Sequence, residues 1–251
     1  MKKFLLFLLL ASSLAVSFLS AQEEKRASRI TFTPSLTLSY NLIDCTLGED
    51  KVENRLVFQY GTLGLDVELL DFLTLGVKAG YNLSHFHDPV DLAELPLTLR
   101  LDQSKFQGLV FGLLIKSEPL SFRNFAVKIN AEGLYVMENS KQWPVELPLV
   151  SGTASVKNRF WLLTLDLVLE FQGFSNPSIF VGPRLNLLRG KISGSEAIES
   201  LTGEQSLKVA QANLLGPVAG ITYELGDNWE LTLKASYLSR LAATLEILYF
   251  F

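Results

Sequence analysis

The stretch "RITFTPSLTLSYNL", residues 29–42, alternates apolar and polar side chains without interruption. Apolar residues, from Ile30 and Phe32 to Tyr40 and Leu42, occupy every second position. The positions between them are mostly Thr, Ser and Asn. A period of two is typical of a β-strand whose two faces meet different surroundings. The stretch therefore predicts a strand with one apolar face and one polar face.

Nine further segments repeat this alternation, and almost no helical periodicity is found within them. The ten predicted strands span residues 30–42, 54–70, 73–83, 106–116, 125–137, 159–171, 178–188, 213–225, 229–238 and 243–251. In the second segment the phase changes near residues 61–64, which we interpret as a β-bulge. Eight strands are the alternative if segment 55–70 or the last hairpin is misread.

The predicted connections alternate in length along the chain. Those after even-numbered strands are short: residues 70–71, 117–124, 173–177 and 226–228. Those after odd-numbered strands are mostly long and polar: residues 42–54, 84–104, 138–158 and 190–210. Short turns on one rim and long loops on the other are typical of an outer-membrane barrel. Local capping patterns predict short helices in two of the loops, one beginning at Asp88 and one running from Ser193 to Gly203.

Residues 1–21 have the features of a secretory signal peptide. Lys2 and Lys3 precede an apolar run to Leu19, and the small residues Ser20 and Ala21 form a cleavage site. A membrane anchor is the alternative, but the apolar run is short for a span. We therefore expect a signal peptide at 1–21, a short N-terminal segment at 22–29 and a barrel at 30–251.

Composition restricts the function classes. The sequence has 22 basic and 26 acidic side chains, and loss of Lys2 and Lys3 would leave 20 and 26, a net charge of −6. This balance argues against a nucleic-acid partner. The chain is 48% hydrophobic, yet after residue 21 no apolar run is long enough for a membrane helix. The single cysteine, Cys45, excludes an internal disulfide, and its place between predicted strands indicates an incidental loop thiol.

Aromatic residues indicate which face of the strands is outside. A secreted lipocalin-type barrel would have the same period with an apolar interior. Here the aromatics of the apolar face lie near strand ends, eight or ten residues apart, as in the pair Phe32 and Tyr40. That spacing spans ~20–25 Å on a tilted strand, the height of the apolar band between two aromatic girdles. The predicted girdle residues are Phe32, Tyr40, Tyr81, Phe125, Tyr135, Trp161, Phe171, Tyr223, Trp229 and Tyr237.

The polar face carries charges of both signs, which would cost ~2–4 kcal/mol for each Lys or Arg facing lipid at mid-depth. We therefore predict that these side chains pair inside the barrel. They are Lys78, Lys128, Glu132, Asp166, Arg184, Lys234 and Glu246. Centring the two short hairpins on residues 175 and 240 places Asp166 opposite Arg184 and Lys234 opposite Glu246. The same registers place Phe171 opposite Ile179 and Tyr237 opposite Ala243.

The chain resembles bacterial outer-membrane β-barrel proteins, broadly the small OmpA-, OmpX- and OmpW-like porin-type group. The signal sequence, the alternating strands and the closing strand "ATLEILYFF", residues 243–251, carry the resemblance. In that group a C-terminal aromatic, with apolar residues at alternate preceding positions, resembles the signal read by the barrel assembly machinery. The resemblance implies this role for Ile247, Tyr249 and Phe251. It also implies an outer-membrane location with lipid, lipopolysaccharide and the assembly machinery as partners, and it leaves the oligomeric state open.

Catalytic chemistry has few candidates in the sequence. His85 and His87 are followed by Asp88 and Asp91 in a predicted loop, where a His–Asp dyad could activate water or contribute to a metal site. No Ser–His–acid spacing, two-aspartate motif or full ligand set accompanies them. The sequence therefore predicts no enzymatic activity, no cofactor and no metal.

Two roles remain open for the predicted barrel: a narrow pore or conduit, and a structural surface protein. The alternatives are a surface-loop adhesin or ligand-binding barrel and, third, a loop enzyme using His85 and His87. Loop acids could bind cationic partners or divalent ions; they are Glu49, Asp50, Asp88, Asp91, Glu94, Glu196 and Glu199.

Overall fold

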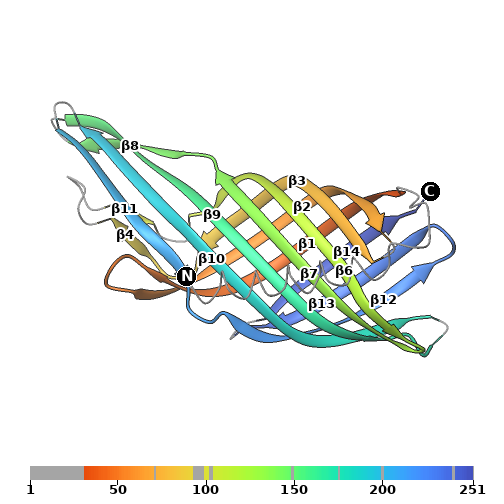
Figure 1. Ribbon diagram of the computed structural model, residues 1–251. Coiled ribbons are helices and arrows are strands. Elements are labelled where there is room, and N and C mark those ends of the chain that lie inside the picture. The colour runs from red at the N-terminus through yellow and green to blue at the C-terminus, as the bar shows by residue number, and fades with distance from the viewer. Residues whose placement is uncertain are drawn as a thin grey trace.

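The computed structural model describes residues 31–70, 72–92, 99–101, 104–147, 150–174, 176–198, 201–238 and 241–250, and in these ranges every regular element is a β-strand (Figure 1). The predicted signal peptide at 1–21, the segment 22–29 and Phe251 lie outside the described residues. In the described ranges, no helix has the length and apolar character needed to cross a membrane. The strands are β1 (Thr31–Leu47), β2 (Val52–Leu70), β3 (Leu73–Phe86), β4 (Val90–Leu92), β5 (Leu99–Leu101), β6 (Phe106–Phe122), β7 (Phe125–Glu138), β8 (Lys141–Leu147), β9 (Val150–Phe171), β10 (Ser178–Ile198), β11 (Leu201–Gln211), β12 (Leu215–Leu225), β13 (Trp229–Tyr237) and β14 (Leu241–Tyr249).

Ten of the described strands pair into a closed antiparallel barrel. Their order is β1–β2–β3–β6–β7–β9–β10–β12–β13–β14, and β14 returns to pair with β1. These ten correspond to the ten predicted strands, so the prediction of ten rather than eight is confirmed for the closed ring. We call the end that carries the connections between β3 and β6, β7 and β9, and β10 and β12 the loop rim. The opposite end is the turn rim.

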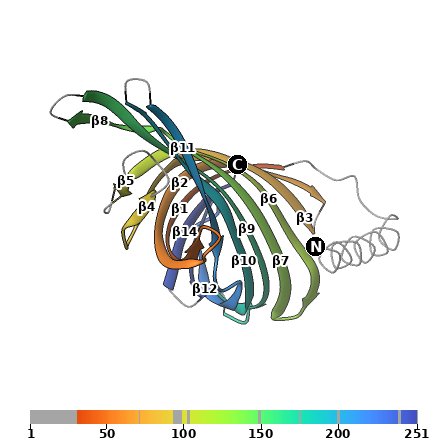
Figure 2. The same cartoon turned by 90° about the vertical axis from the view of Figure 1, so that its left-hand side faces the viewer.

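The barrel narrows toward the loop rim because β11 there takes the place of β12, β13 and β14. On one side of β1, Ser35–Asn41 pair with β14 and Cys45–Leu47 pair with β11. Beyond that level the strand order is β1–β2–β3–β6–β7–β9–β10–β11, which is eight strands. Barrel diameter grows with strand number, so the loop half encloses a thinner interior than the turn half. Figures 1 and 2 show β8, β9, β10 and β11 extending past the other strands at the loop rim.

The two faces of the wall exchange polarity between the halves. Along β1 the inward side chains are polar from Thr33 to Asn41 and become apolar at Ile43 and Leu47, which are buried. The outward side chains are apolar up to Leu42 and become polar at Asp44. Side-chain direction alternates without a break throughout, so only the chemistry changes. The turn half is apolar outside and polar inside, and the loop half is the reverse.

This inversion corrects the predicted bulge in β2. The pairing of β2 with β1 and with β3 runs through residues 61–64 without a register shift, and the irregularity lies between Glu68 and Leu70 instead. Phe58 and Tyr60 point into the barrel, as do Thr62 and Asp66 farther along the strand. A strand whose inner face changes from polar to apolar has the same sequence pattern as a strand with a one-residue bulge. In both cases the apolar residues move from odd-numbered to even-numbered positions, or the reverse.

An apolar core fills the loop half of the barrel. Its buried members come from eight strands of the barrel wall, and the β4–β5 hairpin contributes to it from one of the long connections. They are Ile43, Cys45, Leu47, Leu56, Phe58, Tyr60, Phe86, Val90, Leu92, Leu101, Phe106, Val110, Leu134, Val136, Val156, Phe160, Leu162, Leu188, Ile192 and Val209. An eight-stranded barrel has an interior just wide enough for side chains to fill, which agrees with this packing.

The two predicted loop helices are wrong. After Asp88 the chain enters β4, which pairs with β5 and buries Val90 and Leu92. The predicted capping box beginning at Ser193 lies within β10, which is paired with β9 on one side and β11 on the other. Capping preferences are worth about 1 kcal/mol, and two ladders of backbone hydrogen bonds outweigh them.

The two predicted hairpin registers have different outcomes. Asp166 lies opposite Arg184 and Phe171 opposite Ile179, as predicted. The register of β13 and β14 was wrong, because Lys234 lies opposite Thr244 and Tyr237 opposite Leu241. A shift of two residues leaves every side chain on its face, so alternation alone could not distinguish the registers.

Candidate functional site

The barrel lumen in the turn half is lined by ionisable side chains. The structure places all seven charged residues predicted for the interior on the inner face: Lys78, Lys128, Glu132, Asp166, Arg184, Lys234 and Glu246. They come from β3, β7, β9, β10, β13 and β14, so they are brought together only when the ring closes. We call these residues, together with Asp66, Lys116 and Glu170 described below, the ionic network.

Asp166 and Arg184 form the most buried ion pair of the ionic network. Arg184 Nε donates to Asp166 Oδ1 at 2.6 Å and Nη2 donates to Oδ2 at 2.7 Å. The remaining Nη1 donates to Ser236 Oγ at 2.9 Å, and Lys234 Nζ reaches Asp166 Oδ2 at 3.3 Å. Two parallel hydrogen bonds between guanidinium and carboxylate fix both side chains in one geometry. The pair joins β9 and β10 and, through Ser236 and Lys234, β13.

Two lysines extend the ionic network across the lumen. Lys78 Nζ lies 3.0 Å from Glu132 Oε1 and donates to Thr37 Oγ1 at 3.1 Å. Lys116 Nζ lies 3.0 Å from Asp66 Oδ2 and 2.9 Å from Glu246 Oε1. Lys116 therefore links β6 to β2 and to β14, which are not its neighbours in the sheet. Every buried lysine here has a carboxylate partner, which offsets part of its desolvation cost.

Sequence reasoning missed Asp66, Lys116 and Glu170 as members of the ionic network. Glu170 pairs with Lys128 and also accepts a hydrogen bond from Ser178 Oγ at 2.7 Å. All three lie within the predicted strands and alternate with outward apolar residues, so listing every charge on the polar face of those strands would have found them. Lys116 was passed over because the predicted strand ended there, although β6 continues to Phe122.

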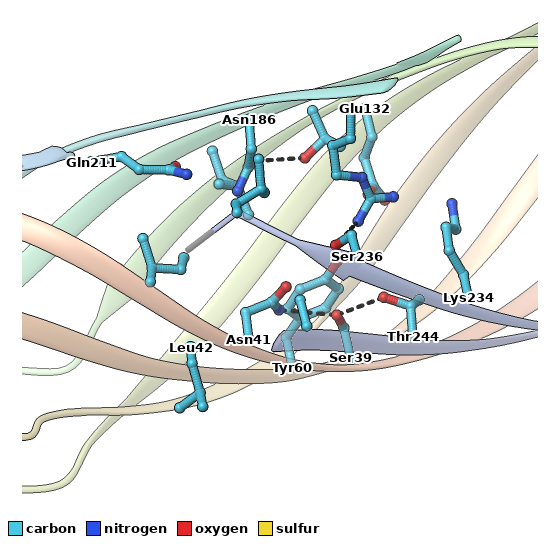
Figure 3. A pocket seen from close by; sticks show the side chains of 16 residues that line it. Ser39, Asn41, Leu42, Tyr60, Glu132, Asn186, Gln211, Lys234, Ser236 and Thr244 are labelled. Carbon is cyan, nitrogen blue, oxygen red and sulfur yellow. Dashed lines mark hydrogen bonds between the residues drawn. The ribbon is translucent and has the colours of Figure 1, made fainter. Parts of the chain in front are cut away.

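A small polar cavity lies between the ionic network and the apolar core (Figure 3). Its volume is about 30 Å³, which holds one or two water molecules. Asn41 Nδ2 donates to Ser39 Oγ at 2.9 Å, and Ser39 Oγ lies 3.0 Å from Thr244 Oγ1. Across the cavity Thr164 Oγ1 donates to Asn186 Oδ1 at 2.9 Å. Side chains from β1, β2, β7, β9, β10, β11, β13 and β14 line this cavity, so residues from around the wall approach one another at this level.

Glu138 is a buried carboxyl group in the loop half, apart from the ionic network. Among the described residues, no lysine or arginine side chain pairs with it. Asn82 Nδ2 donates to Glu138 Oε1 at 2.7 Å, and Asn158 Nδ2 donates to Oε2 at 2.7 Å. The hydroxyl of Ser84 also donates to Oε1. Burial raises the pKa of Glu138, which lies three residues beyond Tyr135 on β7, while the three donors oppose the shift. The cluster ties β3, β7 and β9 together, and the sequence had placed Glu138 in a loop.

The residues considered for catalysis do not assemble into a site. His85 lies on the outward face of β3 opposite Val57, and burial together with Lys105 lowers its pKa. His87 donates its backbone amide to the Arg55 carbonyl at 2.8 Å. Asp88 bonds through its backbone to Asn54. Over the described ranges, no group of three or more His, Cys, Asp or Glu side chains is arranged to hold a metal.

Cys45 is not the loop thiol that the sequence suggested. It lies on the inner face of β1, is 1% exposed and belongs to the apolar core. Burial and the nearby Asp44 carboxylate raise the pKa of the thiol to about 12, so it stays protonated at neutral pH.

The ten predicted girdle residues all lie on the outward face of their strands. Tyr40, Tyr81, Tyr135, Trp161 and Tyr237 lie toward the loop rim, and Phe32, Phe125, Phe171, Tyr223 and Trp229 lie toward the turn rim. Several pack against each other across strands in tilted pairs: the ring centroids of Tyr135 and Trp161 are 4.4 Å apart and those of Phe125 and Phe171 are 5.0 Å apart. Ile247 and Tyr249 also face outward, and Tyr249 packs against Trp229 at 4.6 Å.

Comparison with known proteins gives similarity in fold only. No family model matches the sequence, and no curated protein matches it. Among solved structures, the outer membrane protease OmpT from Escherichia coli is 9% identical, with 90% of this chain and 97% of that chain covered and a TM-score of 0.46. An outer membrane channel from Pseudomonas putida F1 is 11% identical, with 92% and 98% covered and a TM-score of 0.41. The attachment invasion locus protein Ail of Yersinia pestis is 11% identical, with 88% and 97% covered and a TM-score of 0.32. The barrel assignment rests on the strand pairing above.

Proposed function

We propose that the protein is an integral outer-membrane β-barrel with a sealed lumen that serves as a structural surface protein. Its outward face in the turn half supports the membrane location. Large apolar side chains are exposed there on every strand of the ring, among them Leu63, Leu113 and Trp161, each more than 60% exposed. A continuous apolar band of this extent would cause aggregation in water, whereas lipid chains would solvate it.

In this proposal residues 1–21 direct secretion and are removed. The turn rim faces the periplasm and the loop rim faces outward, since short turns and long loops have these places in barrels of this kind. The apolar band between the two girdles contacts lipid, with lipopolysaccharide in the outer leaflet. Ile247, Tyr249 and Phe251 form the segment recognised by the barrel assembly machinery.

One observation carries the sealed lumen: side chains from different strands meet inside the barrel in both halves. The apolar core occupies the eight-stranded half, and the ionic network crosses the ten-stranded half. The cavity between them admits only one or two waters. This filling favours a structural role over a narrow pore.

The surface role is assigned to the sheet at the loop rim. Strands β8, β9, β10 and β11 form four adjacent strands that extend beyond the closed ring. Their outward face is polar, and a shallow cleft on this sheet is lined by Gln142, Thr153, Ser155, Ser195, Thr202 and Glu204, among others. A rigid barrel that displays a polar sheet is suited to contacts outside the cell. No catalysis, cofactor or metal is part of the proposal.

Conductance in planar bilayers tests the sealed lumen. Refolded protein with heat-modifiable gel mobility, which verifies the barrel, should give no stable conductance steps. An open porin in the same bilayers is the positive control. The triple variant Phe58→Ala/Phe106→Ala/Phe160→Ala removes three large buried side chains from the core and should increase conductance. Steady conductance by the wild-type protein would contradict the proposal.

A further inference from the structure

Five basic side chains gather on the outward face of β9, β10 and β11, directly beyond the apolar band. They are Lys157 and Arg159 on β9, Arg189 and Lys191 on β10, and Lys208 on β11. Arg159 lies two residues beyond Trp161, and Arg189 lies two residues beyond Leu187, so the change from apolar to basic is abrupt on both strands. We call these five residues the basic patch.

The register places three of these charges in one row. Lys191 lies directly opposite Arg159 on one side and opposite Lys208 on the other. Neighbouring strands are about 4.7–4.9 Å apart, so the row brings three positive charges within roughly 10 Å. Like charges directly opposite each other destabilise a sheet. Repulsion among the three positive charges therefore destabilises this part of the sheet, and a bound anion would remove that repulsion.

The neighbouring positions supply almost no negative charge. The residues opposite Arg189 are Trp161 and Ala210, and the residue opposite Lys157 is Ser193. Lys208 Nζ lies 3.7 Å from Glu49 Oε1, but both side chains are more than 80% exposed, so this contact is weak. Within the ranges that the structure describes, the other four basic side chains have no carboxylate as cross-strand partner.

Positive charge beyond the apolar band is concentrated in one sector of the barrel. Arg55 on β2 and Lys105 before β6 are separate basic residues elsewhere, and Arg55 lies 3.7 Å from Asp44. Around the rest of the circumference, the first outward residues beyond the apolar band are neutral or acidic, as at Asp44, Gln59, Gln107 and Asn213. A general need for solubility would distribute charge around the wall. A charge concentrated over three adjacent strands points to one ligand at that place.

We propose that the basic patch binds the phosphate groups of a phosphorylated glycolipid in the outer leaflet of the membrane. The inference rests on the proposed membrane location, which places the residues next to Trp161 and Leu187 at headgroup height. The acyl chains of such a lipid would lie against Leu163 and Leu185, each two residues closer to the turn rim than Trp161 and Leu187. Arginine can hold a phosphate with two hydrogen bonds, and the lysines supply further charge.

The test compares two double variants that each lose two positive charges. Arg159→Gln/Lys191→Gln removes the centre of the basic patch, and Lys51→Gln/Arg123→Gln removes two exposed charges from turns outside it. Purified protein in neutral detergent is titrated with lipid A carrying both phosphates and with dephosphorylated lipid A, and bound lipid is counted by native mass spectrometry. Each positive charge near an anionic headgroup strengthens binding about five-fold. The patch variant, which lacks two charges, should therefore bind phosphorylated lipid A about thirty-fold more weakly. The control should bind it as the wild type does.

Three outcomes would overturn the inference: equal wild-type binding of the two lipids, unchanged binding by the patch variant, or displacement by inorganic phosphate at the concentration of the lipid. The last outcome would indicate a site for free anions. Flotation of the wild type with neutral vesicles separates this inference from the proposed function. Failure to float would contradict the membrane location, whereas flotation without a preference for phosphorylated lipid would contradict only the lipid site.

Discussion

Replacement of Asp166 by Asn should be among the most destabilising single substitutions in the turn half of the barrel. The change keeps the shape of the side chain and removes one charge. Arg184 loses the partner of two short hydrogen bonds, and Lys234 loses its contact at 3.3 Å. Asp166 and Arg184 have side chains only 3% and 9% exposed, so neither they nor Lys234 at 17% can recover full hydration.

The magnitude follows from leaving buried cations without a counter-charge. Breaking a buried ion pair by removing one partner costs about 3–5 kcal/mol. The control is Lys208→Gln, which removes the exposed pair with Glu49 and should cost less than about 1 kcal/mol. Adding Arg184→Met to Asp166→Asn should recover part of the loss, because the uncompensated guanidinium is then gone as well.

The assay is urea unfolding of protein folded into lipid vesicles, followed by tryptophan fluorescence and by heat-modifiable gel mobility. Both probes should give the same midpoint for each variant. The reasoning is refuted if Asp166→Asn and Lys208→Gln have the same small effect, or if Arg184→Met adds its full cost to that of Asp166→Asn.

Three further predictions concern other parts of the barrel. Cys45 should resist alkylation by a maleimide at neutral pH until urea unfolds the protein, because the core covers the thiol and its pKa is about 12; rapid labelling of folded protein would contradict this packing. Burial raises the pKa of Glu138 above its usual 4.5, so its contribution to stability is full below that pH and is lost as pH rises through the folded value. The unfolding free energy of the wild type should therefore fall relative to that of Glu138→Gln as pH rises. If urea titrations gave the same difference between the two proteins at every pH, the raised pKa would be contradicted. Gly80→Ala should cost about 1–3 kcal/mol because an added methyl group meets the Gly61 carbonyl. Gly133→Ala should change the unfolding midpoint little, because its methyl group would meet only the Leu163 side chain at 4.0 Å, an ordinary contact.

The ten-stranded ring could be predicted from the sequence because each of its strands keeps a strict period of two. Residues 29–42 and 159–171 show this most clearly, and both correspond to strands of the ring, β1 and β9. The pairing of Asp166 with Arg184 was predictable for the same reason, since a short hairpin fixes the register of its two strands.

The loop half was not predictable because it depends on contacts between distant segments. The sequence assigned residues 84–104, 138–158 and 190–210 to loops, where the structure has β4, β5, β8 and β11 with long extensions of β9 and β10. In these strands the apolar residues point inward, whereas in the turn half they point outward. The rule that the apolar face is the outer face therefore could not be applied along the whole strand. Only the pairing of β11 with β1 shows that the barrel continues there with fewer strands.

The ionic network was predictable in kind and incomplete in membership. The seven predicted charges lie on the inner face, but Lys116 and Glu246 meet across the lumen between strands that are not paired with each other. Alternation gives the face of a side chain and its neighbours within the sheet, and it carries no information about contacts across a barrel.

The central claim is that the outward apolar face of the turn half contacts lipid, and single-tryptophan variants test it most directly. Trp161 and Trp229 are 62% and 48% exposed on that face, near opposite edges of the apolar band, whereas Trp143 lies on β8, is partly buried and packs against the apolar core. Vesicles with brominated acyl chains should quench the fluorescence of Trp161 and Trp229 and leave that of Trp143 nearly unchanged. Equal quenching of all three residues, or quenching of none, would contradict the account.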